Sequence, residues 1–444
     1  MLVLRSNRMI FPEGERPAAL HIEHGVIARI AAHHSEDPTG AALFNAGNLV
    51  VSPGLVDTHV HVNEPGRTAW EGFDTATRAA AAGGVTTIVD MPLNSVPATT
   101  TVAGLGEKRE AARAQCHVDV AFWGGVVPGN TGELDALVDS GVRGFKCFLV
   151  PSGVDEFPAV GESDLREALP ILARRNMPLL VHAELPEYLA ASAQPTHRTY
   201  ATYLATRPPA AEVEAIRLIA RVATEFDARV HIVHVSSAEG VAEIAAAKAA
   251  SVRMTAETCP HYLTFEAGEI ADCATEFKCA PPIRDAAHRD ALWQGLLDGT
   301  LDLIATDHSP APPAMKRPGG SGDFIAAWGG IASLELSLAA TWSGIRGRSA
   351  NVLPLLARWM SEAPAALAGL GARKGRIAPG YDADLVVWDP DAETVVDVTR
   401  LQQRHKLTPY AGRTLRGRVE TTFVGGERVW DRSRLTRAYG GHLL

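Results

Sequence analysis

Apolar and polar positions follow two different patterns along the chain. Near both ends, short runs rich in β-branched residues are separated by turn residues, as in MLVLRSNRMI, ALHIEHGVIARI, ADLVVWDP and ETTFVGGERVW. Between the ends, apolar runs of strand length alternate with Ala-rich stretches of helical character. The central runs that we expect to form strands are 85–92, 117–126, 142–150, 177–184, 228–237, 251–260 and 301–310.

The stretches between these runs predict helices. We expect them at 74–82, 133–140, 163–174, 211–226, 238–248 and 286–298. Strands that alternate with helices in this way indicate a parallel α/β fold, either a closed barrel or an open doubly wound sheet. No G-x-G-x-x-G or Walker-type loop follows any of the runs. We therefore favour the barrel, a TIM-like (β/α)8 arrangement.

The two patterns also divide the chain into domains. The barrel is expected to span 53–375, and the segments 1–52 and 376–444 are expected to join into one small β-sandwich domain. The Pro- and Gly-rich stretch 309–330 follows one of the predicted strands directly. A long loop at that place is a candidate lid over a site.

Composition narrows the class of protein. The chain has 444 residues with 46% hydrophobic and 21% charged, as in a globular protein. With a net charge of −9, the chain has no excess of Lys and Arg to neutralise nucleic-acid phosphates, so we expect no nucleic-acid partner. No stretch is apolar enough to span a membrane, and the N-terminus lacks a signal-peptide pattern. The five cysteines are odd in number and form no C-x-x-C pair, which favours reduced thiols and a cytoplasmic protein.

Candidate chemistry is concentrated at the ends of the predicted strands. In GLVDTHVHVNEPGR (54–67), His59 and His61 are two residues apart, so a strand projects both imidazoles from one face toward a single metal ion. His182 and His234 each close an apolar run, and neutral imidazole is a common metal ligand. In a barrel these strand ends meet on one face, where active sites are built.

Two further strand-end residues complete the set. Asp307, in LIATDHSP, is placed to orient a metal-bound water and to take its proton. Lys146 interrupts the apolar run VRGFKCFLV, where a buried ammonium needs a partner or a chemical change. Surface exposure is the ordinary alternative for a lysine. We interpret His231 as structural, and His308 is not counted as a ligand.

These residues resemble the ligand set of the binuclear amidohydrolases. The similarity extends over nearly the whole chain, through the motifs SPGLVDTHVH, AAGGVTTIVDMP, VHAE, HVSSAEG, ETCPHYL, CAPPIR, ATDHSP and GRIAPGYDADLVVWDP. The chain is similar to the cyclic-amidohydrolase branch, which includes dihydroorotases, hydantoinases and allantoinases. The resemblance implies a metal-dependent TIM-like barrel with a small β-sandwich formed by both chain ends.

Within that branch the chain looks most like the allantoinases. Dihydroorotases carry an Arg two residues after the second histidine, and here that residue is Asn63. Hydantoinases and dihydropyrimidinases usually place a Tyr five residues beyond the lysine, and here that residue is Pro151. The stretches GFKCFLVPSGVDEFP and AWGGIASLEL resemble allantoinase sequences. Allantoin is therefore the expected small-molecule substrate, with allantoate as the product.

The resemblance also assigns roles to residues. It implies two divalent metal ions, zinc first, with cobalt, iron, manganese or nickel as alternatives. It places His59, His61 and Asp307 on one ion, His182 and His234 on the other, and between them Lys146, N6-carboxylated by carbon dioxide. It gives Asp307 the role of general base and general acid, and it places Asn94, Ala280 and Gly329 beside the substrate. Relatives are often homotetramers, so we expect a homo-oligomer.

Two alternatives remain at this point. The first is a hydantoinase or dihydropyrimidinase of the same branch. The second is a non-catalytic scaffold that keeps the fold, although such relatives typically lose several ligands and here all of the ligand positions are occupied.

Overall fold

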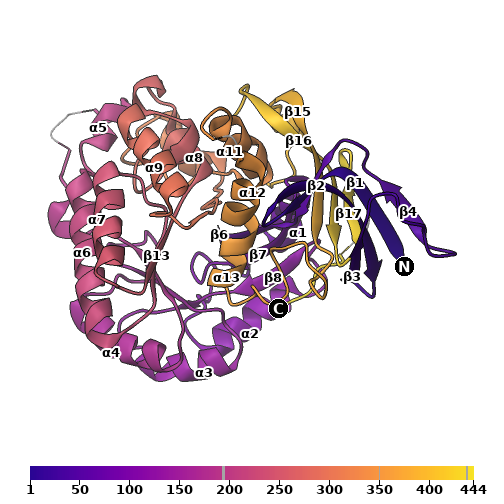
Figure 1. Cartoon of the computed structure of the whole chain (residues 1–444). Coiled ribbons are helices and arrows are strands. Elements are labelled where there is room, and N and C mark those ends of the chain that lie inside the picture. Colours follow the sequence, from indigo (N-terminus) through magenta and orange to yellow (C-terminus); the bar gives the residue numbers. More distant parts are fainter. Residues whose placement is uncertain (193–195, 350, 437–438) are drawn as a thin grey trace.

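The computed structural model describes residues 1–192, 196–349, 351–436 and 439–444. It consists of a barrel-like unit ringed by helices and a strand-rich unit beside it (Figure 1). The strands of the barrel are β6 (Leu55–Val60), β7 (Val85–Asp90), β8 (Asp119–Phe122), β9 (Gly124–Gly125), β10 (Phe145–Phe148), β11 (Leu179–His182), β12 (Val230–Ile232), β13 (Met254–Thr258) and β14 (Leu303–Ile304).

The barrel strands are parallel and close into a ring. Strands β6, β7 and β8 pair in that order, and β9 to β14 pair in sequence order. The chain passes from β8 to β9 through Trp123 alone. The ring closes where the His61 N–H donates to the His308 carbonyl at 2.9 Å and the His308 N–H donates to the His59 carbonyl at 3.2 Å. The expected TIM-like barrel is confirmed.

Helices cover the outside of the barrel (Figure 1). Their bounds are α1 Phe73–Ala82, α2 Val102–Ala112, α3 Leu134–Asp139, α4 Glu162–Arg174, α5 Tyr200–Leu204, α6 Pro209–Phe226, α7 Ala238–Ala249, α8 Pro260–Thr264, α9 Ala286–Asp298, α10 Pro313–Lys316, α11 Ser337–Ile345, α12 Val352–Ala357 and α13 Ala363–Leu367. The six helices expected from the sequence are present with ends within two residues, whereas α2, α5, α8 and α10 to α13 were not expected.

Local sequence explains where the better-defined helices begin and end. Helix α6 starts with Pro209, whose missing N–H costs nothing at the first helical position, and buries Ile216, Ile219 and Val222 on one face. Helix α9 begins after Asp285, whose carboxylate accepts the N–H groups of the first turn, and ends at a glycine in the left-handed region. These helices pack against the strands and bury one continuous apolar core.

The two chain ends form the second unit together. Its strands are β1 (Leu2–Phe11), β2 (Gly14–Glu23), β3 (Val26–Ala31), β4 (Ala42–Asn45), β5 (Val50–Pro53), β15 (Leu385–Val395), β16 (Thr414–Val424), β17 (Glu427–Asp431) and β18 (Arg434–Leu435). Strand β5 lies between β1 and β15, so hydrogen bonds join both ends into one sheet with its own apolar core. In Figure 1 the indigo and yellow strands lie side by side.

Candidate metal centre

The H-x-H pair lies at the carboxyl end of β6, where the barrel closes. His59 is the last but one residue of β6, and His61 comes directly after the end of that strand. The two residues are 1% and 5% exposed. The Asp57 carboxylate accepts the N–H groups of His59 (3.0 Å) and Thr306 (3.2 Å), and so holds β6 against the segment after β14. Burial raises the pKa of Asp57 to about 6. Asp57 therefore supports the strand end instead of facing the ligands.

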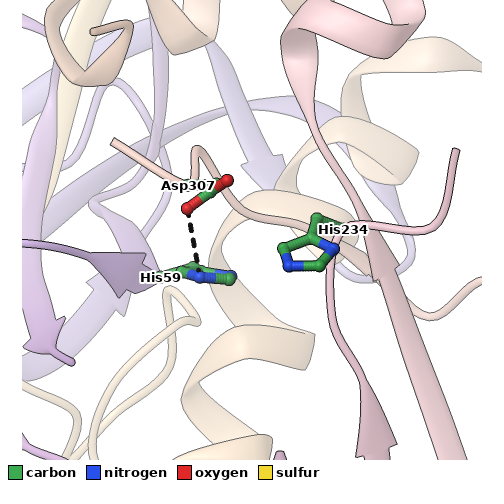
Figure 2. A group of neighbouring side chains, drawn as sticks. All are labelled: His59, His234 and Asp307. Carbon is green, nitrogen blue, oxygen red and sulfur yellow. Dashed lines mark ion pairs between the residues drawn. The ribbon is translucent and has the colours of Figure 1, made fainter. Parts of the chain in front are cut away.

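Asp307 joins both histidines. Its Oδ1 lies 3.2 Å from His59 Nε2 and 3.4 Å from His61 Nε2. The ligand atoms of His59, His234 and Asp307 all lie within 4.8 Å of one another, and Figure 2 shows these side chains converging from three strand ends. Burial favours the neutral acid, but the neighbouring histidines lower the pKa of Asp307, so it is a carboxylate at neutral pH.

Two of these ligands have an unusual backbone. His234 has a φ of 42° and Asp307 a φ of 46°, and both belong to the left-handed region that residues other than glycine seldom adopt. Such conformations cost about 1–3 kcal/mol each and are concentrated at functional sites. The strain turns each side chain inward immediately after its strand, which supports a functional role for both residues.

Glu257 fixes the orientation of His59. Its carboxylate lies 2.5 Å from His59 Nδ1 and 3.0 Å from His231 Nε2. Burial opposes ionisation, but the two histidines lower the pKa of Glu257 to about 2. A carboxylate on Nδ1 leaves Nε2 of His59 as the metal-binding nitrogen. His231 holds Glu257 in turn, in line with the structural role expected for it.

His182, like His59, has a carboxylate partner. His182 Nε2 lies 2.8 Å from Glu184, and Arg207 forms an ion pair with the same carboxylate. The His182 ring stacks on Phe148 at 4.7 Å and meets the His234 ring edge-on at 4.5 Å. The sequence analysis did not identify Glu184 and Glu257 as site residues. The sequence feature that could have identified them is a carboxylate close to the end of a predicted strand. Glu257 is the last but one residue of β13, and Glu184 lies two residues after His182.

Lys146 lies on β10 and is fully buried. Within the described residues its Nζ has no hydrogen-bond partner, and it lies 4.9 Å from the centre of the Phe148 ring. Burial lowers the pKa of Lys146 to about 8, although Asp307 and Glu257 oppose the shift. An appreciable share of neutral amine is therefore available near neutral pH, which is the form that reacts with carbon dioxide.

A cavity of about 760 Å³ opens above these ligands. A volume of this size is typical of sites for small molecules. Five of the residues predicted as metal ligands line the cavity: His59, His61, His182, His234 and Asp307. All three residues expected beside a substrate, Asn94, Ala280 and Gly329, line its walls. Asn94 shares the left-handed backbone of the ligands, with a φ of 68°.

The donor set fits divalent metal ions. The imidazoles of His61, His182 and His234 are neutral at physiological pH, because burial lowers the pKa of His61 to about 4 and also lowers that of His182 and His234. Nδ1 of His61 and of His234 is buried without a partner in the described part of the chain, as is Nζ of Lys146. Buried polar atoms normally have partners, so the two unpartnered imidazole nitrogens near the Asp307 carboxylate fit a site for a cation.

Comparisons with known proteins agree with this geometry. The sequence profile of the amidohydrolase family matches residues 50–429. The chain belongs to the amidohydrolase family. It is 52% identical over 439 residues to the allantoinase of Streptomyces avermitilis, covering 99% of this chain and 97% of that one. It is 42% identical over 450 residues to the allantoinase of Arabidopsis thaliana, covering 97% and 88% of the two chains.

Solved structures of amidohydrolases share the fold. The L-hydantoinase of Arthrobacter aurescens superposes with a TM-score of 0.93 at 30% identity, covering 100% of this chain and 99% of that one. The dihydropyrimidinase of Brevibacillus agri superposes with a TM-score of 0.90 at 26% identity, covering 100% of this chain and 98% of that one. None of the described helices is both long enough and apolar enough to cross a membrane.

Proposed function

We propose that this amidohydrolase is an allantoinase, which hydrolyses the hydantoin-ring amide of allantoin to give allantoate. The observation that carries the proposal is the full-length similarity to allantoinases, at 52% identity for one of them. It is supported by a buried His/Asp centre beneath a cavity large enough for a small cyclic amide. Water adds to the ring carbonyl, the C–N bond breaks, and the nitrogen leaves with a proton.

Metal ions at this centre would polarise the ring carbonyl and lower the pKa of the attacking water. His59, His61 and Asp307 would hold one ion, and His182 and His234 the other. Asp307 is ionised and is therefore ready to accept the proton of the attacking water; once protonated, it donates that proton to the leaving nitrogen. Glu257 and Glu184 keep the His59 and His182 rings in place throughout.

Lys146 is proposed to carry a carbamate. The neutral amine attacks carbon dioxide, an N–C bond forms, and one proton is released. The product is an anion that would be paired with the metal cations, whereas the ammonium form of Lys146 has no hydrogen-bond partner among the described residues. Zinc is the first candidate metal, with cobalt, iron, manganese and nickel as alternatives that the His/carboxylate donor set also accepts.

Substrate contacts are proposed for Asn94, Ala280 and Gly329. All three line the cavity. A Cβ added to Gly329 would meet no atom within 4 Å, so this glycine borders open space. By analogy with the family, we also propose a homotetramer in the cytoplasm, which light scattering and cell fractionation test directly.

A hydantoinase or dihydropyrimidinase is the second candidate, favoured by the structural similarity to such enzymes. Metal-replete protein should be assayed on allantoin, 5-substituted hydantoins, dihydrouracil and dihydroorotate. We expect kcat/KM for allantoin to exceed the others by about 100-fold or more, the range that buried polar contacts provide. Fast turnover of dihydrouracil with little turnover of allantoin would refute the allantoinase proposal.

Metal dependence is tested on the same preparation. Elemental analysis should find about two divalent ions per chain, as expected for a two-metal hydrolase. Chelation should abolish turnover and added metal should restore it. Protein purified without metal and inactive after metal addition would instead support a non-catalytic scaffold.

A further inference from the structure

One short continuous segment contributes six of the residues that line the cavity. Residues 325–330, here called the wall segment, all line the cavity. This segment belongs to the long loop after Asp307, and it includes Trp328 and Gly329. The segment lies in no helix or strand, and the next residue, Ile331, forms only an isolated β-bridge. The conformation of the segment therefore depends on the contacts of its backbone.

Two lysines hold that backbone. Lys278 Nζ donates to the Ile325 carbonyl at 2.9 Å and to the Ala327 carbonyl. Lys316 Nζ donates to the Gly330 carbonyl and to the Lys278 carbonyl at 3.2 Å. The Gly330 N–H donates back to the Lys278 carbonyl at 2.9 Å. The two side chains thus fix the beginning, middle and end of the wall segment.

These lysines bind carbonyls in place of the usual carboxylates. Lys316 is 4% exposed and Lys278 is half-buried, with its ammonium 5.2 Å from the centre of the Tyr203 ring. Among the described residues, neither forms an ion pair. Burying an ammonium without a carboxylate is costly, and hydrogen bonds to several carbonyls offset that cost only while the wall segment keeps this conformation.

The far end of the wall segment is also tied to the metal centre. Gly330 has a φ of 122°, and a Cβ there would lie 2.4 Å from the carbonyl oxygen of Ser309, two residues after Asp307. The Ser309 N–H donates to the Ile331 carbonyl at 3.0 Å. The position of the wall segment is therefore set relative to the catalytic aspartate.

We propose that Lys278 and Lys316 are positioning residues that clamp the wall segment as the substrate-facing side of the cavity. The proposal rests on the proposed hydrolysis of a cyclic amide at this site. Neither lysine is among the proposed metal ligands. Lys316 does not line the cavity and acts through the backbone of the segment, whereas Lys278 holds the same backbone and also lines the cavity. The effect of the clamp is on substrate binding, because the donors of the metal centre lie on other segments.

The test compares Lys316→Met and Lys278→Met with a control, Lys248→Met. Lys248 also forms a short polar contact, 2.7 Å to Asp302, but it lies on the outer helix α7 and is away from the cavity lining. Kinetics are measured on the cyclic amide that the wild-type protein hydrolyses best. Hydrogen exchange of the peptide covering 324–331 and metal content are measured on the same samples.

We expect KM to increase about tenfold in each clamp variant, equivalent to about 1.4 kcal/mol of binding. kcat should stay within about threefold and metal content should not change, while exchange in the wall segment becomes about tenfold faster. The control should match the wild type. If Lys316→Met does not fold, Lys278→Met, at a half-buried position, tests the clamp through hydrogen exchange of the wall segment, because Lys278 also lines the cavity and its KM alone would not separate the two roles.

Unchanged exchange in the wall segment, or a KM equal to that of the control, would overturn the clamp. Failure of the allantoinase proposal is distinguishable, since it appears as a different best substrate for the wild type. The exchange measurement needs no substrate, so it tests the clamp in either case.

Discussion

At the scale of single residues, Lys146 presents the clearest conflict between sequence and environment. Its side chain is fully buried, and its nitrogen has no hydrogen-bond partner among the described residues. Its strand neighbours Phe145 and Cys147 face the apolar core, as the alternation of a strand requires. The conflict is resolved if the nitrogen carries a carbamate that binds metal, as the family resemblance implies.

Replacing Lys146 by alanine should remove the proposed carbamate and so weaken the proposed metal centre. We expect Lys146→Ala to bind fewer than two ions per chain and to lose at least about 100-fold in kcat, in line with the loss of a key metal interaction. Short carboxylic acids should restore part of the activity by occupying the space of the carbamate. A Lys146→Ala protein with two metal ions and full activity would contradict the carbamate proposal.

Glu335 should make stability depend on pH. Burial raises its pKa from 4.5 to about 7, although the Gln402 N–H donates to its carboxylate at 2.5 Å. The folded state therefore holds a proton that the unfolded state has lost, so the free energy of unfolding decreases as pH rises from about 4.5 to about 7. Partial exposure of the side chain keeps the effect below about 3 kcal/mol.

Glu335→Gln removes this titration. Urea denaturation of the variant between pH 5 and pH 8 should show a smaller decrease in the free energy of unfolding than the wild type shows. Equal pH profiles for the two proteins would rule out Glu335 as the cause.

At the scale of elements, helix α2 shows how one buried contact can attach a helix to the barrel. Lys108 on α2 lies 2.7 Å from Asp90 at the end of β7, and both side chains are fully buried. Lys108 also donates to the Met91 carbonyl at 2.7 Å, and Asp90 accepts the Val62 N–H at 2.9 Å. The pair therefore connects α2 to the segment just after His61.

Lys108→Met should leave the Asp90 carboxylate buried without its cation. Removing one partner of a buried pair costs about 3–5 kcal/mol, so we expect a decrease of that size in the free energy of unfolding. Chemical denaturation measures it. The double variant Lys108→Met/Asp90→Asn should recover part of the loss, and a single variant within about 1 kcal/mol of the wild type would show that the pair contributes little.

At the scale of the whole molecule, a buried charge cluster connects the barrel to the terminal sheet. Lys374 lies 2.7 Å from Asp119 on β8 and 2.5 Å from Asp384, which directly precedes β15. Burial opposes the ammonium, but Asp384 and Asp119 raise the pKa of Lys374 and keep it charged. Asp384 also accepts the Gly425 N–H at 2.8 Å, so the cluster anchors the sheet at two places.

Lys374→Met should weaken this connection. Two buried aspartates would lose their cation, and we expect a loss of at least about 3 kcal/mol in the free energy of unfolding. Lys248→Met, which removes a partly exposed ion pair, should lose no more than about 1 kcal/mol. Denaturation curves that are equal for the two variants would contradict a connecting role for Lys374.

Much of the fold could be predicted from the sequence, because strand and helix periodicities are local. The apolar runs around Lys146, His182 and His234 became strands or strand ends, and the six expected helices are present. Helix α2 escaped prediction because its sequence VAGLGEKREAA contains two glycines and lacks a clear apolar face. It depends on the Thr101 cap and on the buried Lys108, which are visible only in the folded chain.

The sequence by itself determined the amidohydrolase family, the barrel class and the positions proposed as metal ligands, which remain a prediction until metal binding is measured. The sequence could do so because a period of two residues decides which face of a strand a side chain occupies. Only the tertiary structure decided that Glu257 holds His59, that Glu184 holds His182 and that Lys278 and Lys316 hold the wall segment. These contacts join residues far apart in the chain, and they form only when the parallel strands close into a ring and bring their ends to one face.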